Sequence, residues 1–537
     1  MRGKKIAVVV LALFTLFASQ AFAYEAQLKP YKDVGDDYAK EAIYTLSALG
    51  IIDGYEDLTY RPAGSLSREA FVKLLVASSQ MELDTGRLPN DVAKDRWSAP
   101  YISAAYENGW LTGLLDSEDK LNPAQTITRQ EVAMLIGTSQ LQALDEEAKE
   151  SWLSAEWEEE RDNRQFKDAG AIEESMQPYV YYAVRLGIME GDPTGFKPKD
   201  SLNRKQAAAV IYRLLDSRIS GQKTDFTGYY ALGSYPAIKQ VDKMSHVIYG
   251  WANLQYGGAG SAASLNTSTT EYKVPAGYGE ALDAADQAGA SKELMVFYNN
   301  ANLKEFLKDQ PAQEAFIESL LATLNDPAYS FNGVHLDFEG LKEAESAPDF
   351  VSFLRELEEQ LGEYTLSVAV PPVEYYKGYD LKAIGELADT VVLMAYDFTH
   401  SESFLPSAPL PLVNETVQTA LQSIPKEKLV LGVSKQANQW ITDTNGVTGK
   451  VFRPTIADVE KRLASAGVEA TWSVPFLLKK LEFQDERGKH LIYYEDTQSI
   501  EKKIWLAKYY GLKGVSLWYM GNYTASDWEL VEKHASN

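Results

Sequence analysis

The second half of the chain alternates short apolar runs, rich in β-branched and aromatic residues, with segments of helical periodicity. This alternation is typical of parallel strands that are joined by helices. Eight strands are predicted, over residues 226–232, 244–254, 293–300, 333–340, 364–372, 390–398, 428–434 and 513–520. Eight strands close a (β/α)8 TIM barrel, which we assign to residues 225–537. This span exceeds the ~250 residues of a typical barrel, and we expect the excess between about residues 440 and 496.

The first third of the chain contains three related segments, which we call modules 1, 2 and 3 and assign to residues 24–80, 88–142 and 166–217. Each is predicted to hold a helix, a glycine turn, a short extended piece and a second helix. Ser67, Thr128 and Asn203 stand where the N-cap of the second helix belongs, before apolar residues at helical spacing. The chain is therefore predicted to be multidomain, with a mainly α N-terminal part.

Residues 143–165, between modules 2 and 3, are strongly acidic and rich in helix-forming residues. We predict a solvated helical insertion. Its two tryptophans, Trp152 and Trp157, are expected to pack onto neighbouring modules rather than to bind sugar.

The fourth apolar run, residues 331–340, combines two faces of different chemistry. Side chains alternate along a strand, so the apolar face holds Val334, Leu336 and Phe338, and the ionisable face holds His335, Asp337 and Glu339. Gly340 follows, where the strand opens into a loop. In a β/α barrel this is the catalytic end. The alternative is an edge strand that turns its polar face to solvent.

The N-terminus has the pattern of a signal peptide at residues 1–23. Basic residues precede an apolar run, and Ala21, Phe22 and Ala23 form a small-x-small cleavage site. The run is shorter than the ~20 residues that a membrane span needs. We expect cleavage before Tyr24 and export, without a later membrane span; an uncleaved anchor is the alternative.

Composition narrows the function classes. The chain contains no cysteine, which excludes disulfides, thiol catalysis and cysteine-ligated zinc. Its net charge of -24 predicts repulsion from nucleic acid and from anionic membranes. A bound polyanion would therefore have to be met by local basic sites.

The stretch 331–340 resembles the signature of family 18 glycoside hydrolases, D-G-x-D-x-D-x-E. Asp337 and Glu339 match its last two acidic positions, whereas Asn332 and His335 stand where the family most often has aspartates. The sixth strand carries an M-x-Y-D arrangement with Met394, Tyr396 and Asp397, and Trp518 ends the eighth strand. The chain is most similar to the bacterial branch that cuts spore cortex peptidoglycan.

The resemblance implies a role for each of these residues. Family 18 enzymes use the N-acetyl group of the substrate as the nucleophile. Glu339 would then protonate the leaving oxygen, Asp337 would orient the acetamido group, and Tyr396 would hydrogen-bond to it. The expected substrate-binding residues are Tyr229, His335, Met394, Asp397 and Trp518. Neither a metal nor a cofactor is expected.

The three modules resemble S-layer homology (SLH) modules, whose hallmark is T-R-A-E at the start of the second helix. Module 2 keeps this pattern from Thr128 to Glu131, and modules 1 and 3 depart from it. The resemblance implies binding of secondary cell-wall polysaccharide, often through its pyruvate ketal. Arg68, Arg129 and Arg204 are the expected ligands, since an arginine fork beside free helix N–H groups suits a carboxylate. The alternative is that these arginines are only surface helix formers.

Three functions compete. The favoured one is a wall-attached hydrolase of β-1,4-linked N-acetylglucosamine glycans, either peptidoglycan or chitin. The second is a lectin-like surface protein with weak or no catalysis, although such relatives usually lose the catalytic glutamate, and Glu339 is present. The third is a structural surface-layer protein, for which polar residues at strand ends are unnecessary.

His335 departs from the family pattern and carries a hypothesis of its own. On an inward-facing strand it lies beside Asp337, and a protonated imidazole is expected to pair with that carboxylate. His335 would then set the acidic side of the pH profile. The alternative is that it only fills space beneath the site.

Overall fold

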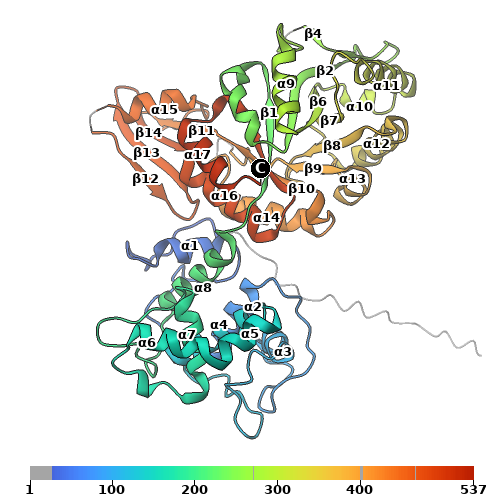
Figure 1. Cartoon of the computed structure of the whole chain (residues 1–537). Coiled ribbons are helices and arrows are strands. Elements are labelled where there is room, and N and C mark those ends of the chain that lie inside the picture. Colours follow the sequence, from blue (N-terminus) through green and yellow to red (C-terminus); the bar gives the residue numbers. More distant parts are fainter. Residues whose placement is uncertain (1–26, 270, 400–402, 466, 537) are drawn as a thin grey trace, which may run out of the picture.

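The computed structural model describes residues 27–269, 271–399, 403–465 and 467–536. A helical N-terminal part lies against one side of a β/α barrel (Figure 1). The predicted signal peptide, residues 1–23, lies outside the described residues. Within the described residues, no helix combines the length and the apolar character needed to cross a membrane.

Eight parallel strands of the described chain form a closed ring, as predicted. They are β1 (Asp225–Tyr230), β2 (His246–Gln255), β6 (Ser291–Tyr298), β7 (Gly333–Phe338), β8 (Thr365–Val370), β9 (Thr390–Leu393), β10 (Leu429–Ser434) and β15 (Gly514–Trp518). Each strand pairs with the next in this order, and β1 pairs with both β2 and β15, which closes the barrel. Strand β3 (Ser264–Asn266) extends the sheet at β2, and β4 (Ser268–Thr269) pairs with β5 (Tyr272–Lys273).

Helices cover the outside of the barrel (Figure 1). They are α9 (Tyr278–Ala288), α10 (Leu303–Phe306), α11 (Gln310–Leu324), α12 (Ala347–Leu361), α13 (Leu381–Leu387), α14 (Leu410–Leu421), α16 (Thr497–Tyr510) and α17 (Ala525–His534). The apolar face of β7 packs against them: the Phe338 ring lies 5.7 Å from Phe353 of α12 and 6.4 Å from Phe316 of α11. The predicted alternation along β7 is confirmed, because its opposite face points into the barrel.

The expected insertion forms a small lobe of its own beside the barrel. It holds β11 (Ala437–Thr442), α15 (Ile456–Leu463), β12 (Ala470–Ser473), β13 (Leu478–Asp485) and β14 (Gly488–Tyr494). The four strands form an antiparallel sheet in the order β11-β14-β13-β12. We call this part, residues 437–494, the insertion lobe.

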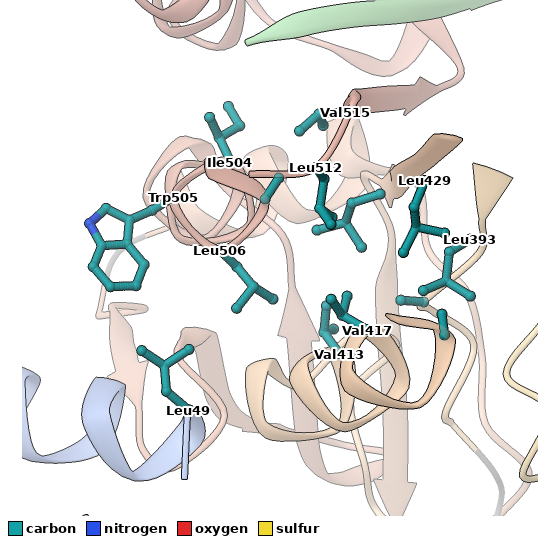
Figure 2. Close-up of a cluster of buried hydrophobic side chains, with 14 of the residues drawn as sticks. Leu49, Leu393, Val413, Val417, Leu429, Ile504, Trp505, Leu506, Leu512 and Val515 are labelled. Carbon is teal, nitrogen blue, oxygen red and sulfur yellow. The ribbon is translucent and has the colours of Figure 1, made fainter. Parts of the chain in front are cut away.

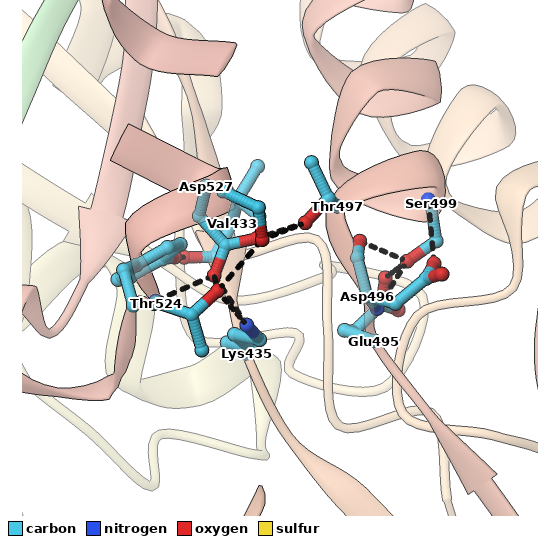
Figure 3. Close-up of polar contacts among 10 residues, drawn as sticks. Val433, Lys435, Glu495, Asp496, Thr497, Ser499, Thr524 and Asp527 are labelled. Carbon is cyan, nitrogen blue, oxygen red and sulfur yellow. Dashed lines mark hydrogen bonds and ion pairs between the residues drawn. The ribbon is translucent and has the colours of Figure 1, made fainter. Parts of the chain in front are cut away.

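Two buried ion pairs fasten the end of the insertion lobe and the C-terminal helix to the barrel, and Figure 3 shows the first of them. Lys435, just after β10, pairs with Asp527 of α17, and both side chains are at most 4% exposed. Glu495 accepts hydrogen bonds from Lys503 at 2.8 Å and from Ser499 at 2.5 Å, within the first turns of α16. Removing one member would leave a buried charge without a partner, so each pair holds its elements in register.

The N-terminal part holds the predicted repeats. Its helices are α1 (Lys40–Ala48), α2 (Arg68–Ser78), α3 (Ala99–Glu107), α4 (Arg129–Leu141), α5 (Glu146–Ser151), α6 (Trp157–Arg164), α7 (Gln177–Arg185) and α8 (Arg204–Ile219).

In each module one aspartate accepts two successive backbone N–H groups of the extended piece: Asp33 from Tyr60 and Arg61, Asp91 from Leu121 and Asn122, Asp168 from Phe196 and Lys197. The predicted N-caps are confirmed for Ser67 and Asn203, whose side chains accept backbone N–H groups of the following helix.

The modules close into a ring because each capped helix bonds to the next module. The first two helix N–H groups donate to carbonyl groups there: Arg68 and Glu69 to Gln125 and Pro123, Arg129 and Gln130 to Asp200 and Pro198, Arg204 and Lys205 to Gly64 and Pro62. These N–H groups are therefore occupied. The expectation that they stand free for a carboxylate is wrong, since the neighbouring backbone already satisfies them.

The acidic insertion between modules 2 and 3 is helical, as predicted. The Trp152 indole N–H donates to the Pro178 carbonyl at 2.9 Å, and its ring lies 4.9 Å from that of Tyr182. The Trp157 ring lies 6.4 Å from Tyr181. Both tryptophans thus pack onto α7 of module 3, which confirms that prediction.

The two parts of the molecule meet along α1 and α8 on one side and α14 and α16 on the other (Figure 1). Leu49, just after α1, faces Trp505 of α16 (Figure 2). The Trp505 ring stacks on Tyr212 of α8 at 6.2 Å, and its indole N–H donates to Asp216 at 3.3 Å. The chain between the two parts, residues 220–224, is short because α8 continues to Ile219.

Candidate active site

A cavity of about 540 Å³ opens at the carboxyl ends of the barrel strands. Four of the predicted site residues line it: Glu339, Met394, Tyr396 and Asp397. The β/α barrel explains this position, because residues just beyond parallel strands gather at one mouth. Asp337 and His335 lie deeper, inside the barrel, and are 4% and 0% exposed.

The carboxyl groups of Asp337 in β7 and of Glu339 just beyond it sit in surroundings that favour their protonated forms. Burial, and next the charge of Glu339, raise the pKa of Asp337 well above its usual value. Burial, and next the charge of Asp397, raise the pKa of Glu339. The Oδ1 atom of Asp337 is buried and has no hydrogen-bond partner among the described residues. The pair can therefore retain a proton at a pH where exposed carboxyl groups are ionised.

Strand β9 is shorter than predicted, and this changes how Tyr396 and Asp397 are presented. The strand ends at Leu393, and the next two N–H groups bond back by only two residues, Ala395 to Leu393 and Tyr396 to Met394. Such tight turns curl the chain away from the sheet. Asp397 then adopts a left-handed backbone with φ of 64°, and its N–H donates to Ser407 Oγ at 3.1 Å.

Three aromatic side chains lie around the two carboxyl groups. Burial, and next the charge of Asp337, raise the pKa values of Tyr229 and Tyr396 well above the usual value, so both hydroxyl groups keep their protons. Trp518, at the end of β15, meets the Tyr229 ring edge-on at 5.1 Å. The site therefore offers two hydroxyl groups and an aromatic wall beside a protonated acid.

Comparison with known proteins matches this barrel to one family. The sequence model described as "Glycosyl hydrolases family 18" matches residues 224–522, and the model described as "S-layer homology domain" matches residues 30–72, 90–133 and 165–208. The first match covers more than half of the chain. The chain belongs to glycosyl hydrolase family 18.

Individual relatives agree with this assignment. The chain is 28% identical to the cortical fragment-lytic enzyme of Bacillus subtilis over 241 residues, which are 42% of this chain and 54% of that protein. It spans about half the length of the curated relatives it matches.

Two solved structures share the family 18 barrel fold with this chain. The spore cortex-lytic enzyme SleL of Bacillus cereus has a TM-score of 0.50 and 21% identity, covering 59% of this chain and 75% of that one. The chitinase of Chromobacterium violaceum has a TM-score of 0.50 and 20% identity, covering 58% of this chain and 99% of that one.

The family 18 site contains residues that the sequence analysis missed. Tyr376 lines the cavity, and the charges of Glu339 and Asp397 add to burial in raising its pKa. Arg453, from the insertion lobe, lies 3.6 Å from Asp397, and Lys342 lines the cavity. The Tyr375-Tyr376 pair after two prolines was a visible signal for the first of these. No local pattern marks Arg453, because the insertion lobe brings it to the mouth.

His335 is placed differently from the expectation. Its Nε2 atom lies 2.9 Å from the Tyr229 hydroxyl group and its Nδ1 atom 2.6 Å from Ser367 Oγ. Burial lowers the pKa of His335 to about 4, so the ring is neutral near pH 7. The expected ion pair with Asp337 is therefore wrong, and a fully buried ring is not placed to contact a bound sugar.

The three SLH arginines act as links between modules. Arg68 pairs with Glu131 at 2.6 Å and donates to the Leu121 carbonyl. Arg129 donates to the carbonyl groups of Phe196 and Glu190, and Arg204 donates to those of Tyr60 and Asp53.

A second cavity, of about 670 Å³, lies between the modules. We call it the module groove. It is lined by Lys73 of module 1, Trp97 and Tyr101 of module 2, and Arg204 of module 3. Of the three predicted arginines, Arg204 therefore lies at a cavity, whereas the Arg68 side chain is only 10% exposed.

Proposed function

We propose that the protein is a cell-wall-attached hydrolase of β-1,4-linked N-acetylglucosamine glycans that acts by substrate-assisted, retaining catalysis. One observation carries the proposal. The carboxyl group of Glu339 lines the barrel cavity with a raised pKa, two residues beyond a buried Asp337. A raised pKa favours the protonated form of the carboxyl group, which is the form that a general acid needs for cleavage of a glycosidic bond.

The chemistry follows from the positions of these groups. Glu339 gives its proton to the leaving oxygen while the acetamido oxygen of the substrate attacks the anomeric carbon from the other side. Asp337 holds the acetamido N–H, and the Tyr396 hydroxyl group holds its carbonyl oxygen. The resulting oxazolinium ion is then opened by water, with Glu339 as the base. Met394, Asp397 and Trp518 hold the sugar ring during these steps.

The mechanism restricts the substrate to glycans with a 2-acetamido sugar, such as peptidoglycan or chitin. Lys342 lines the cavity, and Arg453 lies 3.6 Å from Asp397, which also lines it. Of the two glycans only peptidoglycan carries carboxylates, on its muramyl units and peptides. These charges therefore favour peptidoglycan.

The decisive experiment measures release of reducing sugar from chitin oligomers and from purified peptidoglycan. Glu339→Gln keeps the shape of the side chain but removes the acid, and it should lower the rate by about 10²–10⁴. Glu343→Gln is the matched control, because Glu343 is half exposed and pairs with Lys304 outside the cavity. A Glu339→Gln variant as active as the control would rule out the proposed mechanism, and sugar binding without any hydrolysis by the wild type would favour the lectin-like alternative.

Attachment to the wall is assigned to the module groove. Arg204 supplies positive charge there, Lys73 pairs with Asp53 of the same lining at 2.9 Å, and Trp97, 52% exposed, supplies a face on which a sugar can stack. An anionic polysaccharide fits this combination of groups.

Binding to purified sacculi tests the attachment. The full-length Glu339→Gln protein should be used, because it leaves the sacculi intact. Replacing Lys73 and Arg204 together by alanine should weaken binding at least tenfold, whereas Lys120→Ala, at an exposed ion pair that does not line the groove, should not. Undiminished binding to sacculi stripped of secondary polysaccharide by acid would contradict the assignment.

A further inference from the structure

A chain of buried polar side chains runs beneath the active site through the inside of the barrel. The Tyr229 hydroxyl group of β1 contacts His335 of β7, His335 contacts Ser367 of β8, and Ser367 contacts Glu293 of β6. Glu293 lies 3.1 Å from Nε2 of His246 at the start of β2. Four of the five are below 8% exposed, and His246 is partly exposed at the other end of the barrel. Four buried polar groups in an apolar barrel are costly unless their hydrogen bonds are complete.

When Glu293 is ionised, the hydrogen bonds in this chain can run in only one direction. Burial is the largest influence on the Glu293 pKa and raises it, but the contact with His246 and the hydrogen bond from Ser367 act in the opposite direction, and the lowered pKa favours the ionised form of Glu293. An ionised carboxylate only accepts, and the Thr365 hydroxyl group also donates to it, at 2.7 Å. The single proton of Ser367 therefore goes to Glu293, and Ser367 Oγ must accept from Nδ1–H of His335.

The same reasoning continues to Tyr229. A neutral imidazole that carries its proton on Nδ1 can only accept at Nε2. The Tyr229 hydroxyl group must then donate to His335. The Tyr229 hydroxyl proton therefore points to His335 and away from Asp337. Toward the cavity, the Tyr229 oxygen can only accept hydrogen bonds.

Asp337 is the group most affected by this arrangement. The ionisable groups that face it come from several elements: Tyr229 of β1, Tyr272 of β5, Glu339 beyond β7, Tyr379 before α13 and Tyr396 beyond β9. No hydrogen bond reaches its Oδ1 atom among the described residues. With the Tyr229 proton directed to His335, burial and the charge of Glu339 favour the protonated form of Asp337.

We propose that His335, Ser367 and Glu293 are positioning residues that hold the Tyr229 hydroxyl proton away from Asp337, so that Asp337 keeps its own proton. This inference rests on the proposed function, because Asp337 is the group assigned to the acetamido N–H of the substrate, which the carbonyl oxygen of a protonated carboxyl group can accept. The family pattern most often has an aspartate at the place of His335. In this chain His335 occupies that position, and Ser367 links it to the buried carboxylate of Glu293.

The first test needs no substrate. In protein labelled with ¹⁵N at its five histidines, the His335 resonances, assigned with His335→Asn, should show a proton on Nδ1 and none on Nε2 between pH 6 and 8. The Asp337 carboxyl carbon, assigned with Asp337→Asn, should titrate well above the usual range. A proton on Nε2 of His335 would overturn the proposal.

The second test breaks the relay at Ser367. Ser367→Ala removes the acceptor for Nδ1–H and should move the tautomer toward Nε2–H. The Tyr229 proton can then turn to Asp337, and the Asp337 titration should fall by about one pH unit. Ser367→Thr keeps a hydroxyl group and should restore the wild-type value. Ser516→Ala is the matched control, because Ser516 is an equally buried barrel serine whose Oγ has no partner among the described residues.

The outcomes separate the relay from the proposed function. If Ser367→Ala and Ser516→Ala leave the Asp337 titration equally unchanged, the relay is only packing and the inference fails. If the tautomer and the titrations behave as stated but no glycan is cleaved, the relay stands and the proposed function fails. If the protein is active, kcat/KM of Ser367→Ala should show a pH profile displaced in the same direction as the Asp337 titration, whereas that of Ser516→Ala should match the wild type.

Discussion

At the scale of single residues, the site depends on carboxyl groups whose burial is unfavourable for the fold. Asp337 is 4% exposed and its pKa is raised, chiefly by burial and next by Glu339. A group with this property destabilises the native state whenever it must ionise, and such groups gather at functional sites.

Asp337→Asn should stabilise the protein above pH 4. The pKa of Asp337 is higher in the folded protein than in the unfolded chain, where it is ~3.9. Asp337 therefore contributes its full stability below pH ~3.9, and this contribution is lost as the pH rises through the pKa of the folded protein. The loss is ~1.4 kcal/mol for each unit of difference. Thermal unfolding at pH 4 and pH 7 should therefore show a gain in the variant that is larger at pH 7. Exposed Asp283 of α9, changed to Asn, is the control; an equal gain at both pH values would contradict the prediction.

At the scale of elements, arginine contacts join the modules in addition to the apolar core that they share. Arg68 of α2 and Glu131 of α4 form a pair whose side chains are 10% and 7% exposed, and Glu131 also accepts the Thr128 N–H at 2.8 Å. The pair thus connects the starts of two capped helices in different modules. Buried pairs of this kind hold register more than they add stability.

Arg68→Met should destabilise the N-terminal part by ~3–5 kcal/mol, because it leaves Glu131 buried without a partner. The double variant Arg68→Met/Glu131→Leu should recover most of this loss. Arg61→Met, which removes an ion pair that is about half exposed on both sides, should cost no more than ~1 kcal/mol. Urea unfolding followed by tryptophan fluorescence measures all three; equal costs for Arg68 and Arg61 would show that the buried pair has no special role.

At the scale of the whole molecule, the modules are docked on the barrel rather than merely tethered to it. Lys502 of α16 donates to Tyr212 of α8 at 2.7 Å and pairs with Glu41 of α1 at 2.5 Å. Trp505 of α16 completes the contact by stacking on Tyr212. This surface fixes how the active site is held relative to the proposed wall attachment, since residues 220–224 alone leave orientation free.

Trp505→Ala should loosen this docking, because it removes the stacked ring and the hydrogen bond to Asp216. We expect faster proteolysis at residues 220–224 and separate melting transitions for the two parts in calorimetry. Trp505→Phe keeps an aromatic ring, so its proteolysis rate and its melting behaviour should lie between those of Trp505→Ala and the wild type. A single transition and unchanged cleavage in Trp505→Ala would mean that other contacts dominate the interface.

Much of the architecture is visible in local patterns. The eight barrel strands, the two faces of β7 and the helix starts at Ser67 and Asn203 follow from periodicity and from capping chemistry, which depend on near neighbours in the sequence. The family signature likewise singles out Glu339 and Asp397, near the ends of two predicted strands, and both line the cavity.

The partners of these residues were decided only by the tertiary structure. Nothing near Arg68 in the sequence indicates Glu131, and nothing near His335 indicates Ser367, Glu293 or Tyr229, because these contacts join residues between 32 and 106 positions apart. Packing determines which donor meets which acceptor once water is excluded, so a residue whose type suggests one role can acquire another. The sequence by itself therefore determined the barrel, the repeats and the acid at the strand end. The tertiary structure, in which the strands and the modules each close into a ring, decided which hydrogen-bond partners His335 and the module arginines have.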